Sequence, residues 1–107
     1  MGLTEADAKA LVSEGILSAD YDEHKEAIEF YDKALKIVET SEIYLNKGIS
    51  LVELEKYDDA ISSYEKAIEI SPGYADAWYN KGELLKHKEQ NDEAETCFAK
   101  VKELEGE

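Results

Sequence analysis

Apolar residues recur every three or four positions along this chain, in six stretches separated by short polar joints. Such spacing places them on one face of a helix, so it predicts six amphipathic helices. The expected helices are 5–19, 23–38, 42–54, 57–70, 75–88 and 91–105. Because the joints inside each pair are too brief for anything but a helical hairpin, we expect antiparallel pairs. We further expect Thr4 and Ser41 to act as caps, and Ser71-Pro72-Gly73 to break the chain between units.

The helix pairs repeat, with small residues recurring at two positions and an aromatic residue at a third. These positions hold Ala27, Ala60 and Ala94, then Gly15, Gly48 and Gly82, then Tyr31, Tyr64 and Phe98. A glycine inside a helix costs about 1 kcal/mol relative to alanine, so its periodic recurrence needs a compensating contact. We therefore expect the small residues where paired helices cross, with the aromatic ring filling the space beside them.

The third unit carries Trp78, Gly82, Ala94 and Phe98 at the spacing of the tetratricopeptide repeat, a family that the chain resembles from about residue 8 to residue 105. The resemblance implies an all-α fold, a right-handed superhelical stack of three antiparallel helix pairs (an α-solenoid). It implies a single domain spanning 1–107, with repeats at about 8–40, 41–74 and 75–107.

Two features depart from the repeat pattern. The leucine expected before each glycine is Glu14, Lys47 or Lys81, and we expect these sites to be partly exposed. The last helix carries Glu95 and Lys102 where the earlier units have apolar residues. These polar residues predict a last helix that closes its own end of the stack, as terminal repeats require.

The resemblance implies that the first helix of each unit lines a concave groove that binds a peptide segment of a partner protein. We expect an apolar floor with acidic residues around it, and a ligand with apolar anchors and Lys or Arg flanks. The predicted groove residues are Val12, Ile16, Leu45, Asn46, Ile49, Val52, Glu53, Asp76, Tyr79, Asn80 and Glu83. Alternatively, several of the apolar residues pack only between neighbouring first helices.

Some members of the family hold acidic carboxyl tails of chaperones in a clamp of Lys, Asn, Asn, Lys and Arg. The matching positions here are Val12, Ile16, Asn46, Asp76 and Asn80. Only Asn46 agrees, and Asp76 would repel a carboxylate where a cation should meet it. We therefore predict that this chain has no chaperone-tail carboxylate clamp.

Charge narrows the choice of partners. Twelve lysines face 26 acidic residues without any arginine, and the formal net charge is −14. Phosphate backbones and anionic membranes would be repelled, so we expect no nucleic acid and no membrane as partner. The acidity serves solubility, adaptation to a salty cytoplasm or attraction of a basic partner, and charge alone does not choose among these.

Motifs for catalysis or ligand binding are not recognisable in the sequence. His24, His87 and Cys97 lie at unrelated repeat positions, and no phosphate-cradling glycine loop occurs, so we expect no metal, no cofactor and no enzyme activity. A lone cysteine and the lack of an apolar run long enough for a bilayer indicate a cytoplasmic protein. We predict a non-catalytic interaction module, monomeric or weakly dimeric. The alternative is a structural assembly element that self-associates or docks end to end on a larger complex.

Overall fold

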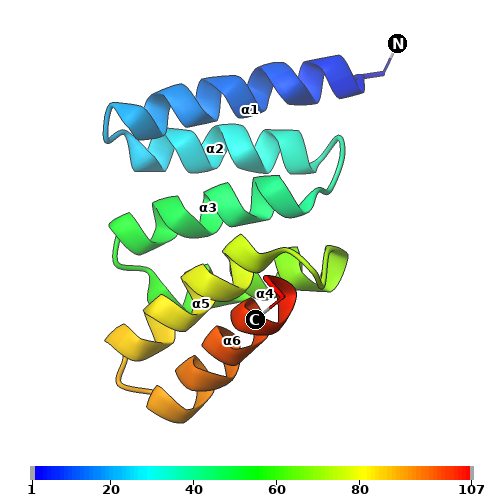
Figure 1. Ribbon diagram of the computed structural model, residues 1–107. Helices are drawn as coiled ribbons and strands as arrows, with labels where there is room; N and C mark the ends of the chain where they lie inside the picture. Colours follow the sequence, from blue (N-terminus) through cyan, green and yellow to red (C-terminus); the bar gives the residue numbers. More distant parts are fainter. Residues whose placement is uncertain (1, 107) are drawn as a thin grey trace.

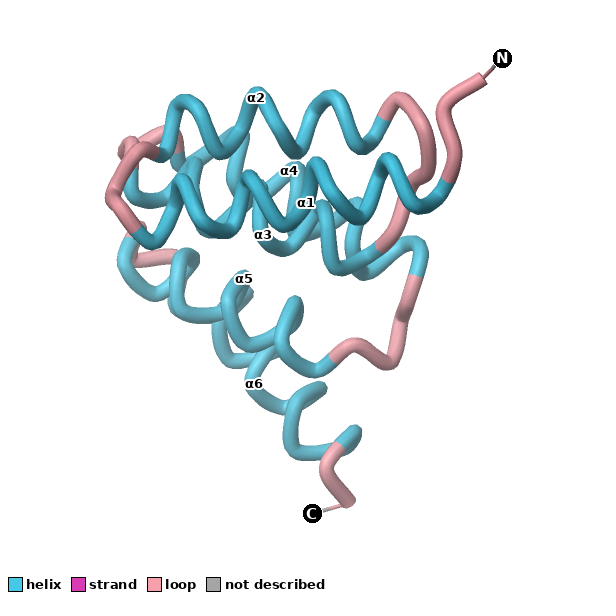
Figure 2. Tube along the Cα trace, turned by 90° about the horizontal axis from the view of Figure 1, so that it is seen from above, coloured by secondary structure: helices cyan, strands magenta, loops and turns pink. Residues whose placement is uncertain are grey.

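The computed structural model describes residues 2–106, which form six helices stacked as antiparallel pairs (Figure 1). The helices are α1 (Glu5–Asp20), α2 (His24–Leu35), α3 (Ser41–Glu53), α4 (Tyr57–Ile70), α5 (Ala75–His87) and α6 (Asn91–Leu104). Each odd-numbered helix packs on the helix that follows it, and α2 then contacts α3 as α4 contacts α5. Seen from above, the last pair turns away from the direction of α1 and α2, so the stack is twisted (Figure 2). The predicted all-α fold is confirmed.

Capping side chains set where the first and third helices begin. Thr4 caps α1 as predicted: its Oγ1 accepts a hydrogen bond from the Asp7 amide at 3.3 Å, while the Asp7 carboxylate accepts one from the Thr4 amide at 2.8 Å. The prediction that Ser41 caps the third helix was wrong. Thr40 does so instead, because its extended backbone lets Oγ1 accept from the Ile43 amide at 3.2 Å.

The second helix ends at Leu35, three residues before the predicted end. Beyond it the chain folds back in a tight turn, in which the Val38 amide donates to the Ala34 carbonyl at 3.0 Å. Ile37 and Val38 pack from this turn against the core of the first pair. Because these two residues are apolar and packed against the core, they extended the helical pattern in the sequence beyond the actual end of the helix.

The turn inside each helix pair contains one residue in the left-handed backbone region. These residues are Asp22, Glu55 and Glu89, with φ of 62°, 61° and 62°. The amide after Glu55, that of Lys56, donates to the Leu51 carbonyl at 2.9 Å, and the other two turns make the corresponding bond. This is the pattern that satisfies the last carbonyls of a helix before a sharp reversal. The three hairpins thus share one turn geometry.

The recurring glycines lie where the paired helices cross, as predicted. A Cβ atom placed on Gly48 would lie 2.5 Å from Cε1 of Tyr64, closer than real Cβ contacts allow. The corresponding distance is 2.5 Å for Gly15 against Tyr31 and 2.7 Å for Gly82 against Phe98. Each aromatic ring therefore occupies the volume that a larger residue would need, which explains how the cost of a mid-helix glycine is offset.

The two lysines that stand in place of leucine in the repeat pattern join one helix pair to the next. Lys47 Nζ lies 2.8 Å from the carboxylate of Asp32 on α2, and Lys81 Nζ lies 3.3 Å from that of Glu65 on α4. The two lysine side chains are 26% and 19% exposed, so they are partly covered as they cross between pairs. Glu14, at the same position of α1, is exposed. The substitution of leucine by lysine therefore adds an ion pair between neighbouring units.

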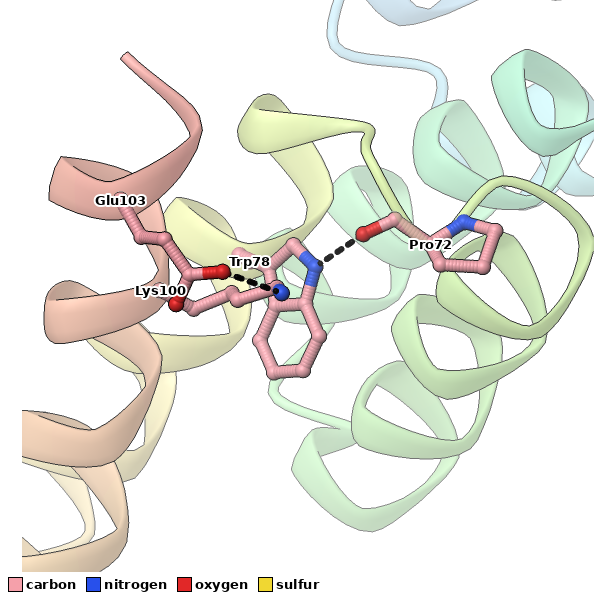
Figure 3. A network of polar contacts seen from close by, with 4 residues as sticks. All are labelled: Pro72, Trp78, Lys100 and Glu103. Atoms are coloured by element: carbon pink, nitrogen blue, oxygen red, sulfur yellow. Dashed lines mark hydrogen bonds and ion pairs between the residues drawn. The ribbon is translucent and has the colours of Figure 1, made fainter. Parts of the chain in front are cut away.

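An indole ring ties the joint between the second and third pairs to α5 (Figure 3). Trp78 Nε1 donates a hydrogen bond of 2.8 Å to the carbonyl oxygen of Pro72. Nearby on α6, Lys100 Nζ lies 3.1 Å from the carboxylate of Glu103. The helices end at Ile70 and resume at Ala75, so the predicted break at residues 71–73 is confirmed.

Candidate functional site

The first helices of the three pairs form one layer. α1 contacts α3 and α3 contacts α5, whereas within residues 2–106 no comparable contact joins α2 to α4 or α4 to α6. In a curved stack, the helices that approach one another most closely form the inner side. We call this side of α1, α3 and α5 the inner surface. Besides Leu45, the predicted groove residues that these three helices carry are Val12, Ile16, Asn46, Ile49, Val52, Glu53, Asp76, Tyr79, Asn80 and Glu83.

Each helix of this layer has at least one large apolar side chain that is substantially open to solvent. Ile16 on α1 is 43% exposed, Ile49 on α3 is 39% exposed and Tyr79 on α5 is 49% exposed. Apolar area gains about 25 cal/mol per Å² when it is removed from water, so these side chains can act as anchors for a ligand. The inner surface thus offers one apolar anchor from each unit.

The remaining predicted floor residues belong more to the core. Leu45 is only 7% exposed and is part of the central core cluster with Tyr64 and Ala77. Val12 and Val52 are half-buried and pack against the first and central clusters. The alternative that some apolar residues pack only between neighbouring helices therefore holds for Leu45. The accessible apolar floor is smaller than the predicted one.

A hollow of about 320 Å³ separates α1 from α3. Val12, Ile16 and Asn46 line it, and so does Glu42 at the start of α3. Glu5 and Lys9 line it too, so the hollow combines the anchor of the first unit with an amide, two carboxylates and one ammonium group. This combination suits a ligand that inserts an apolar side chain beside a polar backbone.

A second hollow of about 260 Å³ lies between α3 and α5. Val52, Asn80 and Glu83 line it, together with the rings of Tyr57 and His87, whose centroids are 5.2 Å apart in an edge-on arrangement. The groove prediction did not include Tyr57, because it begins a second helix and the pattern assigns the inner side to first helices. Its position opposite His87 became visible only in three dimensions.

A larger hollow of about 400 Å³ lies on another part of the surface, between α2, α3 and α4. Its wall includes the ion-paired Asp32 and Lys47 together with Asp59 and Lys66. Because the joint between the first two pairs runs through it, we interpret this hollow as a packing feature of that joint.

Carboxylates dominate the charge of the inner surface. Glu53, Asp76 and Glu83 are all exposed along it. Asn80 Nδ2 donates a hydrogen bond of 2.8 Å to the backbone carbonyl of Asp76, so that nitrogen is engaged by its own helix. The resulting negative field attracts lysine and arginine side chains.

Reactive groups are poorly placed for chemistry. Cys97 is 3% exposed, and burial raises the pKa of its thiol, which disfavours the nucleophilic thiolate at neutral pH. Within residues 2–106, no three His, Cys, Asp or Glu side chains are grouped so that they could hold a metal ion. No helix of that part of the chain is both long and apolar enough to cross a membrane.

Burial raises the pKa of Tyr64 to about 12, from an ordinary value of 10.0, and this predicts a loss of stability at alkaline pH. The unfolded chain loses the phenolic proton first, so the contribution of the neutral phenol is complete below pH 10 and declines as pH rises toward 12. The expected decline is about 1.4 kcal/mol per pH unit in that window. Urea unfolding at stepped pH should show a weaker decline for Tyr64→Phe, and equal declines would contradict the assignment.

Three antiparallel helix pairs, with a glycine under an aromatic ring in each and an inner layer of first helices, define a helical repeat protein of the tetratricopeptide type. Two family models support this. The model described as TPR repeat matches residues 48–89, and the model described as tetratricopeptide repeat matches residues 75–107. The chain belongs to the tetratricopeptide repeat family, whose fold is a protein-interaction domain.

Comparison with known proteins identifies several relatives. The uncharacterized protein MJ0572 of Methanocaldococcus jannaschii is 34% identical over 61 residues, which make up 57% of this chain and 71% of that protein. The structure of MamA is similar with a TM-score of 0.87 at 23% identity, covering 92% of this chain and 58% of the MamA chain. The first TPR of Spaghetti (RPAP3), solved with the HSP90 peptide SRMEEVD, is similar with a TM-score of 0.91 at 22% identity, covering 96% and 82%. At these identities the two structures show a shared fold.

Proposed function

We propose that the protein is a non-catalytic adaptor that binds a peptide segment of a partner protein on its inner surface. The observation that carries this proposal is the set of exposed anchors Ile16, Ile49 and Tyr79, one from each inner helix. Hollows on either side of α3 give neighbouring side chains of a ligand room to enter. An unpaired, buried cysteine suits the cytoplasm, where we place the protein.

The ligand that fits this surface has apolar anchors with lysine or arginine beside them. Apolar residues of the peptide would cover the three anchors, and its cations would face carboxylates such as Glu53, Asp76 and Glu83. Exposed ion pairs contribute little affinity individually, so the apolar contacts provide most of the binding free energy and the charges provide selectivity. We expect a monomer or a weak dimer that binds one such segment.

A peptide array tests this proposal directly. The array holds three sets of peptides with the same apolar core: a basic set with Lys and Arg in the flanks, a serine set and an acidic set with Glu. The labelled chain is applied at low and at high salt. We expect binding to the basic set, weaker binding to the serine set and none to the acidic set, with the difference between basic and serine shrinking at high salt. Equal binding to all three sets would refute the charge preference. Binding to none of them would refute the groove.

Acidic carboxyl tails are expected not to bind, in contrast to the Spaghetti domain that was solved with SRMEEVD. The sequence has Asp76 and the apolar Val12 and Ile16 at the positions that match the cations and an amide of a carboxylate clamp. In fluorescence anisotropy, SRMEEVD should show no binding at concentrations that saturate a basic-flanked peptide. Introducing the clamp with Val12→Lys, Ile16→Asn, Asp76→Lys and Asn80→Arg should create affinity for SRMEEVD. Binding of SRMEEVD by the unaltered chain would contradict the prediction.

A further inference from the structure

α3 packs on α2, and α5 packs on α4, through residues at matching positions along one side of the helix. We call this row of positions the stripe. Ile43 on α3 is buried in the core cluster of the first pair, and Ala77 on α5 in that of the second. The next positions of the stripe are the ion-paired Lys47 and Lys81, described above. The positions after these are equally well covered: Ser50 is 1% exposed and Leu84 is 4% exposed.

In the third unit the last position of the stripe also reaches back to the preceding unit. It is Lys88, whose Nζ lies 2.6 Å from the carboxylate of Asp58 at the start of α4. The first three positions therefore share one register at both joints: an apolar residue, a lysine and a covered residue. The spacing of these positions follows one side of the helix.

α1 has the same stripe with nothing on it in the described part of the chain. Its members are Ala10, Glu14, Leu17 and Tyr21, which we call the outer face of α1. All four are exposed, with Leu17 at 52% and Tyr21 at 72%. α1 contacts only α2 and α3 within residues 2–106, and it forms the end of the stack (Figure 1). The stripe that α3 buries against α2, and α5 against α4, is thus uncovered on α1 within residues 2–106.

The charge on this face is opposite to that at the two closed joints. Lysine meets a carboxylate of the neighbouring helix at both of them, whereas α1 presents Glu14 at that position. A helix that docks here in the same register would therefore need a lysine or arginine where α2 has Asp32 and α4 has Glu65.

A second copy of the chain does not meet this need. The far end of the stack is α6, and it has Ala99 where a cation is required, with the exposed Glu95 and Lys102 facing the apolar positions. Two copies joined through α1 would cover two Glu14 carboxylates without a cation from either stripe, which is costly in a covered joint. The occupant is therefore a different helix.

We propose that the outer face of α1 docks an amphipathic helix of a partner protein, with an apolar residue at one position and Lys or Arg four residues later. The pattern is taken from α2 and α4, where Ile28 and Ile61 pack against the core of the following unit and the ion-paired carboxylate follows one turn later. The partner's apolar side chains cover Leu17 and Tyr21, and its cation pairs with Glu14. This site is separate from the inner surface, so peptide binding there and helix docking on α1 are independent.

The probe is a stapled helical peptide with the sequence of residues 57–70. It is made in two versions, one with Glu65 retained and one with Glu65→Lys. The staple is placed away from Ile61 and position 65. Fluorescence anisotropy with the full-length chain should show about tenfold tighter binding of the Glu65→Lys peptide, because repulsion from Glu14 becomes attraction. Glu14→Lys in the chain should reverse the preference. Leu17→Ser should abolish binding of both peptides, while Ile49→Ser on the inner surface should leave it unchanged.

The outcomes separate the possible occupants. Equal affinity for the two peptides, or binding that survives Leu17→Ser in a chain shown by circular dichroism to be folded, would overturn the proposal. Sedimentation of the chain alone that shows a dimer dissociated by Leu17→Ser would assign the face to a second copy and would equally overturn it. Failure of the adaptor proposal would appear elsewhere, as loss of charge preference on the peptide array.

Discussion

Replacing Gly48 with alanine lowers the free energy of unfolding by about 2 kcal/mol, although alanine is the better helix former by about 1 kcal/mol. The added Cβ would lie 2.5 Å from Cε1 and 2.8 Å from Cδ1 of Tyr64, whose ring is buried and cannot swing away. The crossing of α3 and α4 must therefore open, and contacts are lost along both helices. Urea denaturation followed by circular dichroism measures the change.

Two variants isolate the cause. Gly73→Ala adds the same atom without a clash, because its nearest neighbour is Leu104 Cδ2 at an ordinary contact distance of 3.9 Å, and stability should change little. Tyr64→Leu frees volume beside Gly48, so adding Gly48→Ala to that variant should cost at least about 1 kcal/mol less than in the parent chain. A Gly48→Ala protein as stable as the parent would show that the contact with Tyr64 is not what requires glycine.

The double variant Ile49→Ser with Tyr79→Ser should bind a basic-flanked peptide from the array at least about tenfold more weakly than the parent. Both side chains are more than a third exposed, so their removal takes apolar area mainly from the inner surface. Tyr79 also contacts the ring of Phe98, with the ring centroids 5.9 Å apart, and that contact is lost too. Anisotropy with the labelled peptide gives the affinity. Thermal unfolding should still show a cooperative transition, with a stability loss of about 1 kcal/mol from the Tyr79–Phe98 contact.

Two further substitutions serve as controls for the binding experiment. Leu17→Ser removes a similarly exposed apolar side chain from the outer face of α1 and should leave peptide affinity unchanged. Leu45→Ala, at a buried position, should instead lower the free energy of unfolding by about 2–5 kcal/mol. If the double variant binds like the parent, the inner surface is not the binding site.

The sequence predicted those properties of the site that arise within one helix, but not those that arise from packing between helix pairs. Ile49 and Leu45 are both apolar residues on the inner side of one helix, and the repeat pattern assigned both to the groove. The structure exposes Ile49 and buries Leu45 in the central core. The difference arises because the rotation of one helix pair against the next determines which of the two is covered, and a single sequence does not contain that angle.

The same limit applies to charge. Lys47 and Lys81 were recognisable as departures from a leucine pattern, but their partners Asp32 and Glu65 lie in the previous unit. Pairing across a joint depends on the offset between helix pairs. The sequence assigned Glu14 to the same repeat position, but only the folded chain showed that no helix within residues 2–106 packs on that side of α1.

The amino-acid sequence by itself determined the six helices, the repeat of three pairs and the crossing of each pair at a glycine, because these follow from the spacing of small and large residues within about 34 positions. The tertiary structure alone decided which inner residues reach solvent, which lysine meets which carboxylate and that the outer face of α1 is open. Those properties arise from packing between units, where a small rotation exchanges a buried side chain for an exposed one.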